Sequence, residues 1–144
     1  MTWKLPNFFQ KLLKSFLSVC LGLLLLIHPF GQAIKAEKAS MSGDFVNDTV
    51  TVAKSLKETI ALPDDDQNFS DSKSESLALI TAYISRYRNR PQVNSTSSFT
   101  TMQTALNAMA GHYKTFSNRP LPEKLKERLN KELTRAEKIV VKEI

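Results

Sequence analysis

The sequence predicts an all-α protein, an up-down-up-down four-helix bundle that follows an export signal. Two observations predict this fold: apolar residues recur at three- and four-residue steps in four windows, and short polar links separate those windows. No segment shows the alternation of a half-buried strand, and only 4 of the 144 residues are glycine. About 110 residues follow the signal, which is enough for one modest core.

Residues 1–33 are predicted to be a cleaved signal peptide. The block is positively charged with no acidic residue, and its apolar run, Ser15–Ile27, leads to small residues that a signal peptidase reads near Ala33. Because the run is shorter than the roughly 20 residues that cross a bilayer, cleavage is favoured over an uncleaved transmembrane anchor. Residues 34–43 lack periodicity and are predicted to be a flexible tether, so the bundle domain occupies residues 44–144.

The single cysteine, Cys20, lies inside the apolar run. A lipoprotein signal places a small residue directly before the cysteine and the apolar run upstream of it. Here Val19 precedes Cys20 and the run continues after it, so lipidation is not expected. Cleavage near Ala33 leaves a mature chain without a disulfide, a thiol nucleophile or a cysteine metal ligand.

Charge is distributed unevenly along the chain. There are 20 basic and 14 acidic residues, and loss of the three lysines in the signal leaves 17 against 14, a net charge of +3. This small excess, together with export, argues against a nucleic-acid partner. Residues 34–85 hold 5 basic and 9 acidic residues, whereas residues 86–144 hold 12 and 5. The basic half is either a set of solvated helix faces or a surface for an acidic partner.

The first predicted helix follows the tether and ends at "LPDDD", because Pro63 disfavours helical backbone in the residue before it. The second is predicted to begin after Ser72, with Glu75 completing a capping box, and to stop before Pro91. The apolar stripe of the first helix is Val46, Val50, Ala53, Leu56 and Ile60. The apolar stripe of the second is Leu77, Ile80, Ile84 and Tyr87.

The third predicted helix has the most regular spacing, and its remaining positions are mostly Thr, Gln, Asn and Ser. Its stripe is Phe99, Met102, Leu106, Met109, Tyr113 and Phe116, with Ala105 and Ala110 beside it. The uncharged outer face suits either a close protein contact or plain hydration. The fourth helix opens with Pro122 and Glu123. Its stripe is Leu125, Leu129, Leu133, Ala136 and Val140.

The residues after the signal provide little for catalysis. His112 is the only histidine there, so no histidine metal set and no Cys-His pair is available, and we interpret it as a hydrogen-bonding helix residue. The acidic run Asp64–Asp66 lacks the spaced ligands of a calcium loop and is interpreted as a solvated turn. We therefore expect no enzyme activity, no catalytic residue, no metal site and no cofactor.

The segment "YISRYRNR" combines tyrosine and arginine, the residue types enriched in binding hot spots. Its arginines, Arg86, Arg88 and Arg90, together with Arg119 before the fourth helix, are the predicted partner-binding residues. The alternative is a helix C-terminus at which positive charge is favourable in any case.

Four segments carry a recognisable pattern. They are "DTVTVAKSLKETIALPDDD" (48–66), "ISRYR" (84–88), "SFTTMQTALNAMAGHY" (98–113) and "RPLPEKLKERL" (119–129). Together they closely resemble the Psb27 family of photosystem II assembly factors, over nearly all of the chain after the tether. The third segment is far more specific than a generic amphipathic repeat.

The resemblance implies a non-catalytic protein on the lumenal side of the thylakoid membrane, peripheral and monomeric when free. Family members bind immature or damaged photosystem II, chiefly at the lumenal loop of a chlorophyll-binding inner antenna subunit. They disfavour premature binding of the extrinsic subunits and so assist assembly of the manganese-calcium-oxide cluster. Many cyanobacterial members are lipoproteins with a cysteine directly after the signal, a pattern from which Cys20 departs.

Three other classes stay open on composition alone. One is an exported bundle that binds a different acidic protein. Another is a secreted cytokine-like ligand, which the sequons at Asn47, Asn68 and Asn94 would suit, although a small secreted bundle without a disulfide is atypical. The third, a metal chaperone or helical enzyme, needs clustered ligands that one histidine does not supply.

Overall fold

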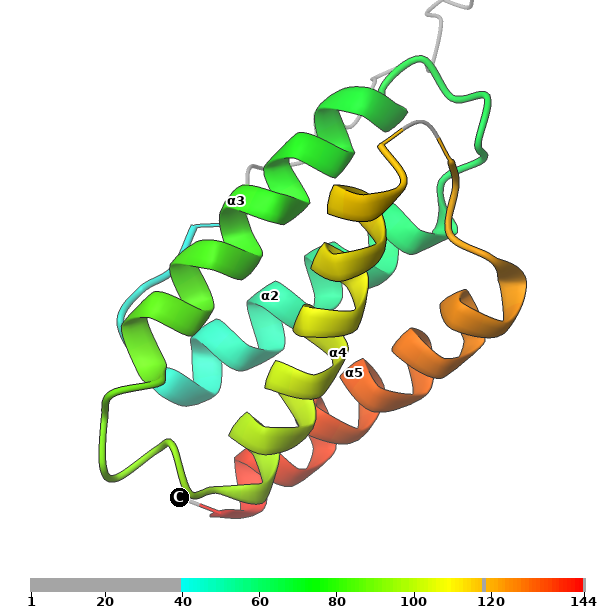
Figure 1. Ribbon diagram of the computed structural model, residues 1–144. Helices are drawn as coiled ribbons and strands as arrows, with labels where there is room; N and C mark the ends of the chain where they lie inside the picture. Colours follow the sequence, from blue (N-terminus) through cyan, green and yellow to red (C-terminus); the bar gives the residue numbers. More distant parts are fainter. Residues whose placement is uncertain (1–39, 118, 144) are drawn as a thin grey trace, which may run out of the picture. The chain divides into compact units, whose positions relative to one another are not determined.

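A computed structural model describes residues 40–117 and 119–143 of the chain. These residues form four helices and no strand: α2 (Phe45–Ala61), α3 (Phe69–Tyr87), α4 (Ser97–Thr115) and α5 (Glu123–Glu143) (Figure 1). The predicted all-α four-helix fold is confirmed. The predicted signal peptide, its cleavage site, Cys20 and residues 34–39 of the tether lie outside the described residues.

The helices form a closed ring of neighbours in which α2 packs against α3 and α5, and α4 packs against the same two helices. Loops of seven to nine residues join them, at 62–68, 88–96 and 116–122, so consecutive helices run in opposite directions. Because each helix presents one apolar stripe, this arrangement lets all four stripes face a common interior.

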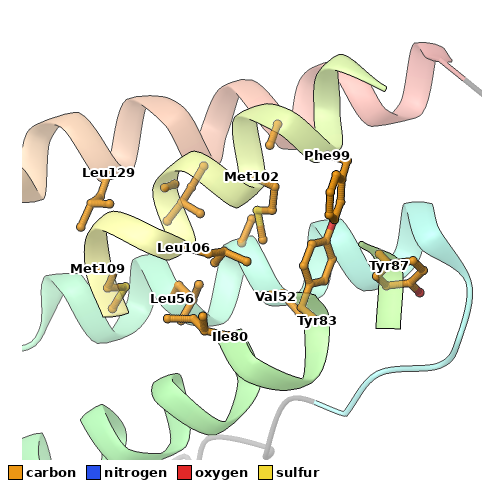
Figure 2. Close-up of a cluster of buried hydrophobic side chains, with 14 of the residues drawn as sticks. Val52, Leu56, Ile80, Tyr83, Tyr87, Phe99, Met102, Leu106, Met109 and Leu129 are labelled. Carbon is orange, nitrogen blue, oxygen red and sulfur yellow. The ribbon is translucent and has the colours of Figure 1, made fainter. Parts of the chain in front are cut away.

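The core takes side chains from all four helices (Figure 2). Its fully buried members include Val52, Leu56, Met102, Leu106 and Leu129. Burial of a side chain of this size contributes about 1.5–3 kcal/mol relative to exposure, so these stripes supply most of the driving force for the fold. The stripe predicted for the third helix is buried from Phe99 to Tyr113.

Two predictions about the second helix are wrong. α3 begins at Phe69, and the backbone amide of Ser72 already donates to the carbonyl of Asn68, so Ser72 is inside the first turn and does not cap the helix with Glu75. Asn68 occupies the cap position, where Asp66 accepts a hydrogen bond from its backbone amide at 2.7 Å. Three serines in five residues made the start ambiguous, because any of them can cap a helix.

The buried face of α3 is also rotated from the predicted one. Its buried residues are Ser76, Ile80, Tyr83 and Tyr87, whereas Leu77 and Ile84 are only half-buried. Partners on α2 explain the rotation: Ser76 donates to the hydroxyl of Thr59 at 3.0 Å, and the hydroxyls of Tyr83 and Thr49 share a bond of 2.6 Å. Satisfied polar groups can be buried at little cost, so they displace the more apolar stripe from the core.

Two further departures from prediction concern α2 and the end of α4. Val46 and Val50 are only half-buried, because the core takes the face of α2 that carries Thr49 and Val52. Phe116 lies past the end of α4 and is 43% exposed, so it does not extend the buried stripe. At the other end, Thr96 accepts a bond from the amide of Phe99 at 3.2 Å, and Glu143 accepts bonds from the amides of Ser97 and Ser98 at 3.0 Å each. The carbonyl of Pro122 accepts the first bonds of α5.

Candidate partner-binding surface

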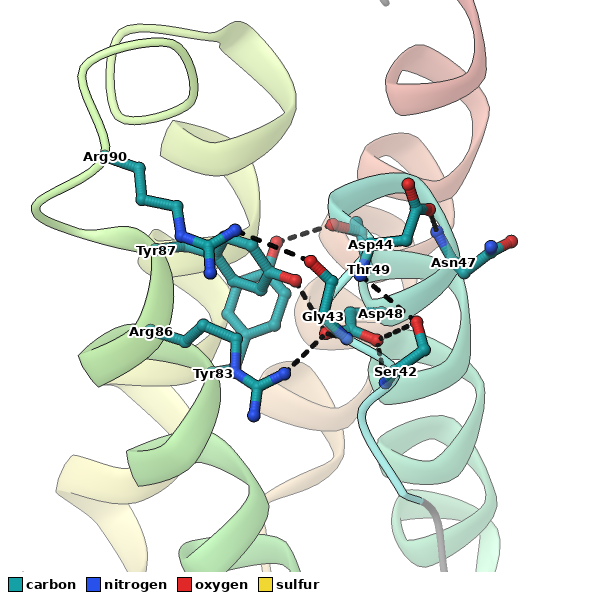
Figure 3. Close-up of polar contacts among 10 residues, drawn as sticks. All are labelled: Ser42, Gly43, Asp44, Asn47, Asp48, Thr49, Tyr83, Arg86, Tyr87 and Arg90. Atoms are coloured by element: carbon teal, nitrogen blue, oxygen red, sulfur yellow. Dashed lines mark hydrogen bonds and ion pairs between the residues drawn. The ribbon is translucent and has the colours of Figure 1, made fainter.

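The end of the bundle where α2 begins and α3 ends is organised around one buried carboxylate, Asp48, whose side chain is 1% exposed (Figure 3). Its Oδ1 accepts bonds from the backbone amide and the hydroxyl of Ser42, at 2.6 and 2.9 Å. Its Oδ2 accepts from the amide of Gly43 at 3.1 Å and from the hydroxyl of Tyr87 at 2.6 Å. Asp48 therefore joins the chain before α2 to the last turn of α3.

The ionised form of this carboxylate is favoured despite its burial. Burial raises the pKa of Asp48, but the hydrogen bonds from Tyr87, Ser42 and Gly43 together outweigh that effect and hold the pKa below its ordinary value. The same burial and the bond to Asp48 raise the pKa of Tyr87, so the tyrosine stays protonated and keeps donating. A fixed negative charge thus sits beneath the arginines of this end.

Two of the predicted arginines are held by this cluster. The guanidinium of Arg86 lies 3.6 Å from Oδ2 of Asp48. That of Arg90 lies 4.8 Å from the centre of the Tyr87 ring and donates to the carbonyl of Gly43 at 3.5 Å. Figure 3 shows both side chains reaching toward the start of α2. Their positions are therefore set by contacts within the bundle, and both keep part of their surface exposed.

Arg88 differs from its two neighbours. It is exposed, and among the described residues its side chain makes no hydrogen bond or ion pair; only its carbonyl is engaged, by the side-chain amide of Asn94 at 3.3 Å. Positive charge is favourable at this helix end because the α3 carbonyls terminate here. The structure brings Arg86, Arg88 and Arg90 together at one end, with Arg88 the most available for a partner.

Arg119 lies at the opposite end of the bundle. Its guanidinium sits 5.6 Å from the centre of the Phe116 ring, just after α4, while the other three arginines adjoin the loop that leads into α4. The 19 residues of α4 separate the two positions, which corresponds to about 28 Å along the helix axis. The four arginines predicted to act jointly therefore do not form one surface.

Sequence reasoning missed Asp48, although a signal for it was present. Asp48 follows Phe45 by three residues and precedes Val52 by four, so it lies on the apolar face of its helix, where a carboxylate must have partners.

The sequence analysis also missed the hydroxyl of Tyr113, which is buried and has no hydrogen-bond partner in the described part of the chain. Burial raises the pKa of that tyrosine to about 12.

His112 and the acidic run Asp64–Asp66 match their sequence interpretations. His112 donates from Nε2 to the carbonyl of Pro120 at 3.0 Å, as expected of a hydrogen-bonding residue. The acidic run forms a turn in which Asp64 lies 3.5 Å from the ammonium of Lys126.

Within residues 40–117 and 119–143 no three metal-ligating side chains gather at one point. None of the four described helices is both long and apolar enough to span a bilayer.

The outer face of α4 is uncharged over most of its length, as predicted. Its exposed positions are Ser97, Thr100, Thr104, Asn107 and Gly111, followed in the last turn by Lys114 and Thr115. The hydroxyls of Thr100 and Thr104 donate to carbonyls one turn earlier, so they need no partner from outside the helix. Both sequence interpretations of this face, protein contact and hydration, stay open.

The family model described as Photosystem II Pbs27 matches residues 10–140. The chain belongs to this family. The chain is 41% identical over 128 residues to the Photosystem II lipoprotein Psb27 of Synechocystis, a match that covers 89% of this chain and 95% of that protein. It is 45% identical over 97 residues to the Photosystem II assembly factor lipoprotein Psb27 of Thermosynechococcus vestitus, covering 67% and 72% respectively.

A solved Psb27 structure has the same fold. The solution structure of Psb27 from cyanobacterial photosystem II matches with a TM-score of 0.69 and 40% identity, and the match covers 81% of this chain and all of that one. The Psb27 resemblance that the four sequence segments indicated is thereby confirmed.

Proposed function

We propose that this protein is a non-catalytic photosystem II assembly and repair factor that acts on the lumenal side of the thylakoid membrane. It binds immature photosystem II, chiefly at the lumenal loop of a chlorophyll-binding inner antenna subunit. While bound, it prevents premature binding of the extrinsic subunits and assists assembly of the manganese-calcium-oxide cluster. Family membership supports the assembly role, and relatives whose names describe photosystem II assembly support the choice of partner.

The proposed mechanism is occupancy of a site rather than chemistry. The buried core and the Asp48 cluster hold the arginine end in one arrangement before any partner arrives. Little conformational entropy is then lost on binding, so a small contact area can give useful affinity. A modest affinity also permits release when a better-fitting subunit competes for the same place.

The proposed contact surface rests on how the side chains of the three arginines are held. Arg86 and Arg90 are positioned by Asp48, Gly43 and Tyr87, while Arg88 projects from the same end without a described partner. Guanidinium groups bind carboxylates bidentately, which suits an acidic loop on the photosystem. Arg119, at the opposite end, is a separate candidate contact.

Both relatives described above are named lipoproteins, which would anchor them to a membrane. The single cysteine of this chain is preceded by valine and followed by the rest of the apolar run. The proposal therefore carries over the assembly role and peripheral association through the photosystem, without a lipid anchor and without a cofactor.

Charge reversal at Arg88 tests the surface. We expect Arg88→Glu to reduce co-purification with photosystem II assemblies that lack extrinsic subunits by roughly tenfold or more, because loss of one charge-assisted contact costs about 1.5–3 kcal/mol. The measurement is quantitative immunodetection on native gels of thylakoid complexes. Far-UV circular dichroism of the purified variant checks that the bundle remains folded.

Lys54→Glu provides the matched control, because Lys54 is an exposed cation on α2 and the change in net charge is the same. It is expected to leave co-purification unchanged. Equal retention of both folded variants would remove the arginine end from the interface. Absence of the wild-type protein from photosystem II assemblies would refute the assembly role and leave an exported bundle with another acidic partner.

A further inference from the structure

The outer face of α5 carries an unbroken row of cations. Its members, which we call the α5 basic stripe, are Lys124, Arg128, Lys131, Arg135, Lys138 and Lys142. All six are exposed, and their spacing of four, three, four, three and four residues keeps them on one side of the helix. The row extends over about 27 Å along the axis, because each helical residue rises about 1.5 Å.

The stripe lies opposite the buried side of α5. Leu129, Leu133, Ala136 and Val140 face the core, and at about 100° per residue the stripe lies on the far side of the helix. The acidic residues of α5 are mostly placed on its flanks. Glu137 pairs with Lys57 of α2 at 2.5 Å, and Glu132 pairs with Arg128 at 2.9 Å. Three acids of α5 are exposed: Glu127 lies beside the stripe near its start, and Glu123 and Glu143 lie at the two ends of the helix.

This arrangement is unfavourable for an isolated helix. Among the described residues, only Arg128 of the six stripe members has an ion-pair partner. Successive members are three or four residues apart, the spacing at which like charges repel on a helix surface. If only the stability of the helix mattered, acidic residues would be expected between these cations, as they are on the two sides of the stripe. The repulsion is relieved when an anionic surface neutralises the stripe.

We propose that the α5 basic stripe binds the anionic headgroups of a lipid bilayer. Four of its six members are lysine, a strongly hydrated point charge that is depleted at the cores of protein interfaces. No aromatic side chain interrupts the row. A straight, lysine-rich row that keeps its hydration suits attraction to a charged membrane surface, which needs no fitted pocket and acts over about one Debye length.

The stripe is independent of the arginine end described above. α5 packs against α2 and α4, and α3, whose C-terminus carries Arg88, lies diagonally across the ring. The protein can therefore rest on a membrane through α5 while the end of α3 contacts a protein. Such adsorption would restrict the search for membrane-embedded photosystem II to the membrane surface.

Vesicle co-sedimentation of the chain from Ile34 onward tests the proposal. This chain omits the predicted signal, whose apolar run would bind lipid by itself, and keeps the residues that form the complete core. A related bundle matched over its whole length folds in solution. Vesicles of phosphatidylcholine are compared with vesicles in which about a third of the lipid is phosphatidylglycerol. We expect binding to the anionic vesicles only, with release at about 0.5 M salt, where screening is nearly complete.

Two double variants locate the binding. The stripe variant is Lys131→Gln and Lys138→Gln, and the control is Lys54→Gln and Lys114→Gln. Each removes two exposed positive charges. The stripe variant is expected to lose at least about tenfold in partition coefficient, because each cation near an anionic surface contributes about fivefold. The control is expected to stay within about threefold of the wild type, since none of its charges lies on α5.

Equal losses in both variants would show attraction by net charge alone and overturn the proposal. Absence of wild-type binding to anionic vesicles at low salt would also overturn it and leave the stripe as a solvated face. A third overturning result is a stripe variant that binds vesicles normally but loses photosystem II in detergent, because the stripe would then contact protein. None of these outcomes depends on Arg88, so the two proposals fail separately.

Discussion

At the scale of single residues, the side chain of Asp48 connects the start of α2 to the end of α3. One carboxylate accepts four hydrogen bonds and lies within ion-pair distance of Arg86. Its partners come from the segment before α2 and from the last turn of α3, so one side chain joins these two parts of the chain. The rigidity of the arginine end therefore depends on this side chain.

We expect Asp48→Asn to lower the free energy of unfolding by about 1.5–3 kcal/mol at pH 7, because an amide donates where the carboxylate accepted. The pKa of Asp48 is lowered in the folded state, so its contribution is present above the unfolded value of about 3.9 and is lost as the pH falls through the folded value. Urea unfolding between pH 7 and pH 3 measures both effects. A variant that retains the wild-type loss of stability on acidification would contradict the assignment.

At the scale of helices, the sequence predicted the position of each helix more reliably than the face of the helix that is buried. The stripes of α4 and most of α5, and the C-terminal half of the α2 stripe, were predictable because each has one dominant apolar row. α3 has two overlapping rows, and the choice between Leu77 and Tyr83 depended on hydroxyl partners from α2. Such partners are separated by tens of residues, so no local pattern reveals them.

Two buried tyrosines, Tyr83 and Tyr113, differ in whether their hydroxyl has a hydrogen-bond partner. We expect Tyr83→Phe to cost about 1–3 kcal/mol, because it leaves the buried hydroxyl of Thr49 without its partner. Tyr113→Phe is expected to be neutral or stabilising, because its hydroxyl has no partner among the described residues. Chemical denaturation of both variants under one set of conditions measures the difference. Equal costs would show that the Tyr113 hydroxyl is satisfied, for example by an ordered water.

At the scale of the whole molecule, the bundle is closed by a contact between its third and last helices. The carboxylate of Glu143, at the end of α5, accepts bonds from the first two amides of α4. With Thr96 it satisfies three of the four amides that a helix start leaves open. Bonds from Ser98 and from the two amides lower the pKa of Glu143, although burial opposes them.

Removing this closure should weaken the fold modestly. We expect Glu143→Ala to cost about 0.5–2 kcal/mol, the range for loss of a helix cap, and Glu143→Gln to cost less because one acceptor remains. Thermal and urea unfolding of the purified chain measure this. Glu127→Ala is the control, since Glu127 is exposed on the same helix and makes no described hydrogen bond. A control that costs as much as Glu143→Ala would argue against the cap.

The candidate surface was only partly predictable at this scale. Arg86, Arg88 and Arg90 are neighbours in sequence, so their proximity followed from their positions alone. Arg119 was grouped with them by charge, but the direction of α4 places it about 28 Å away, and the charge pattern gave no indication of that separation. The α5 basic stripe was visible as spacing, yet its exposure depended on which face of α5 the core takes.

The bonds from Ser42 and Gly43 to Asp48 have a practical consequence for labelling. They fix the point at which the chain enters the bundle, and that point adjoins Arg90. Extended backbone reaches at most about 3.6 Å per residue, so a group attached at Ser40, which is exposed, stays within about 7 Å of Ser42. A fluorophore coupled there would therefore report on whatever occupies the arginine end, whereas one placed at Ser117 would report on the opposite end.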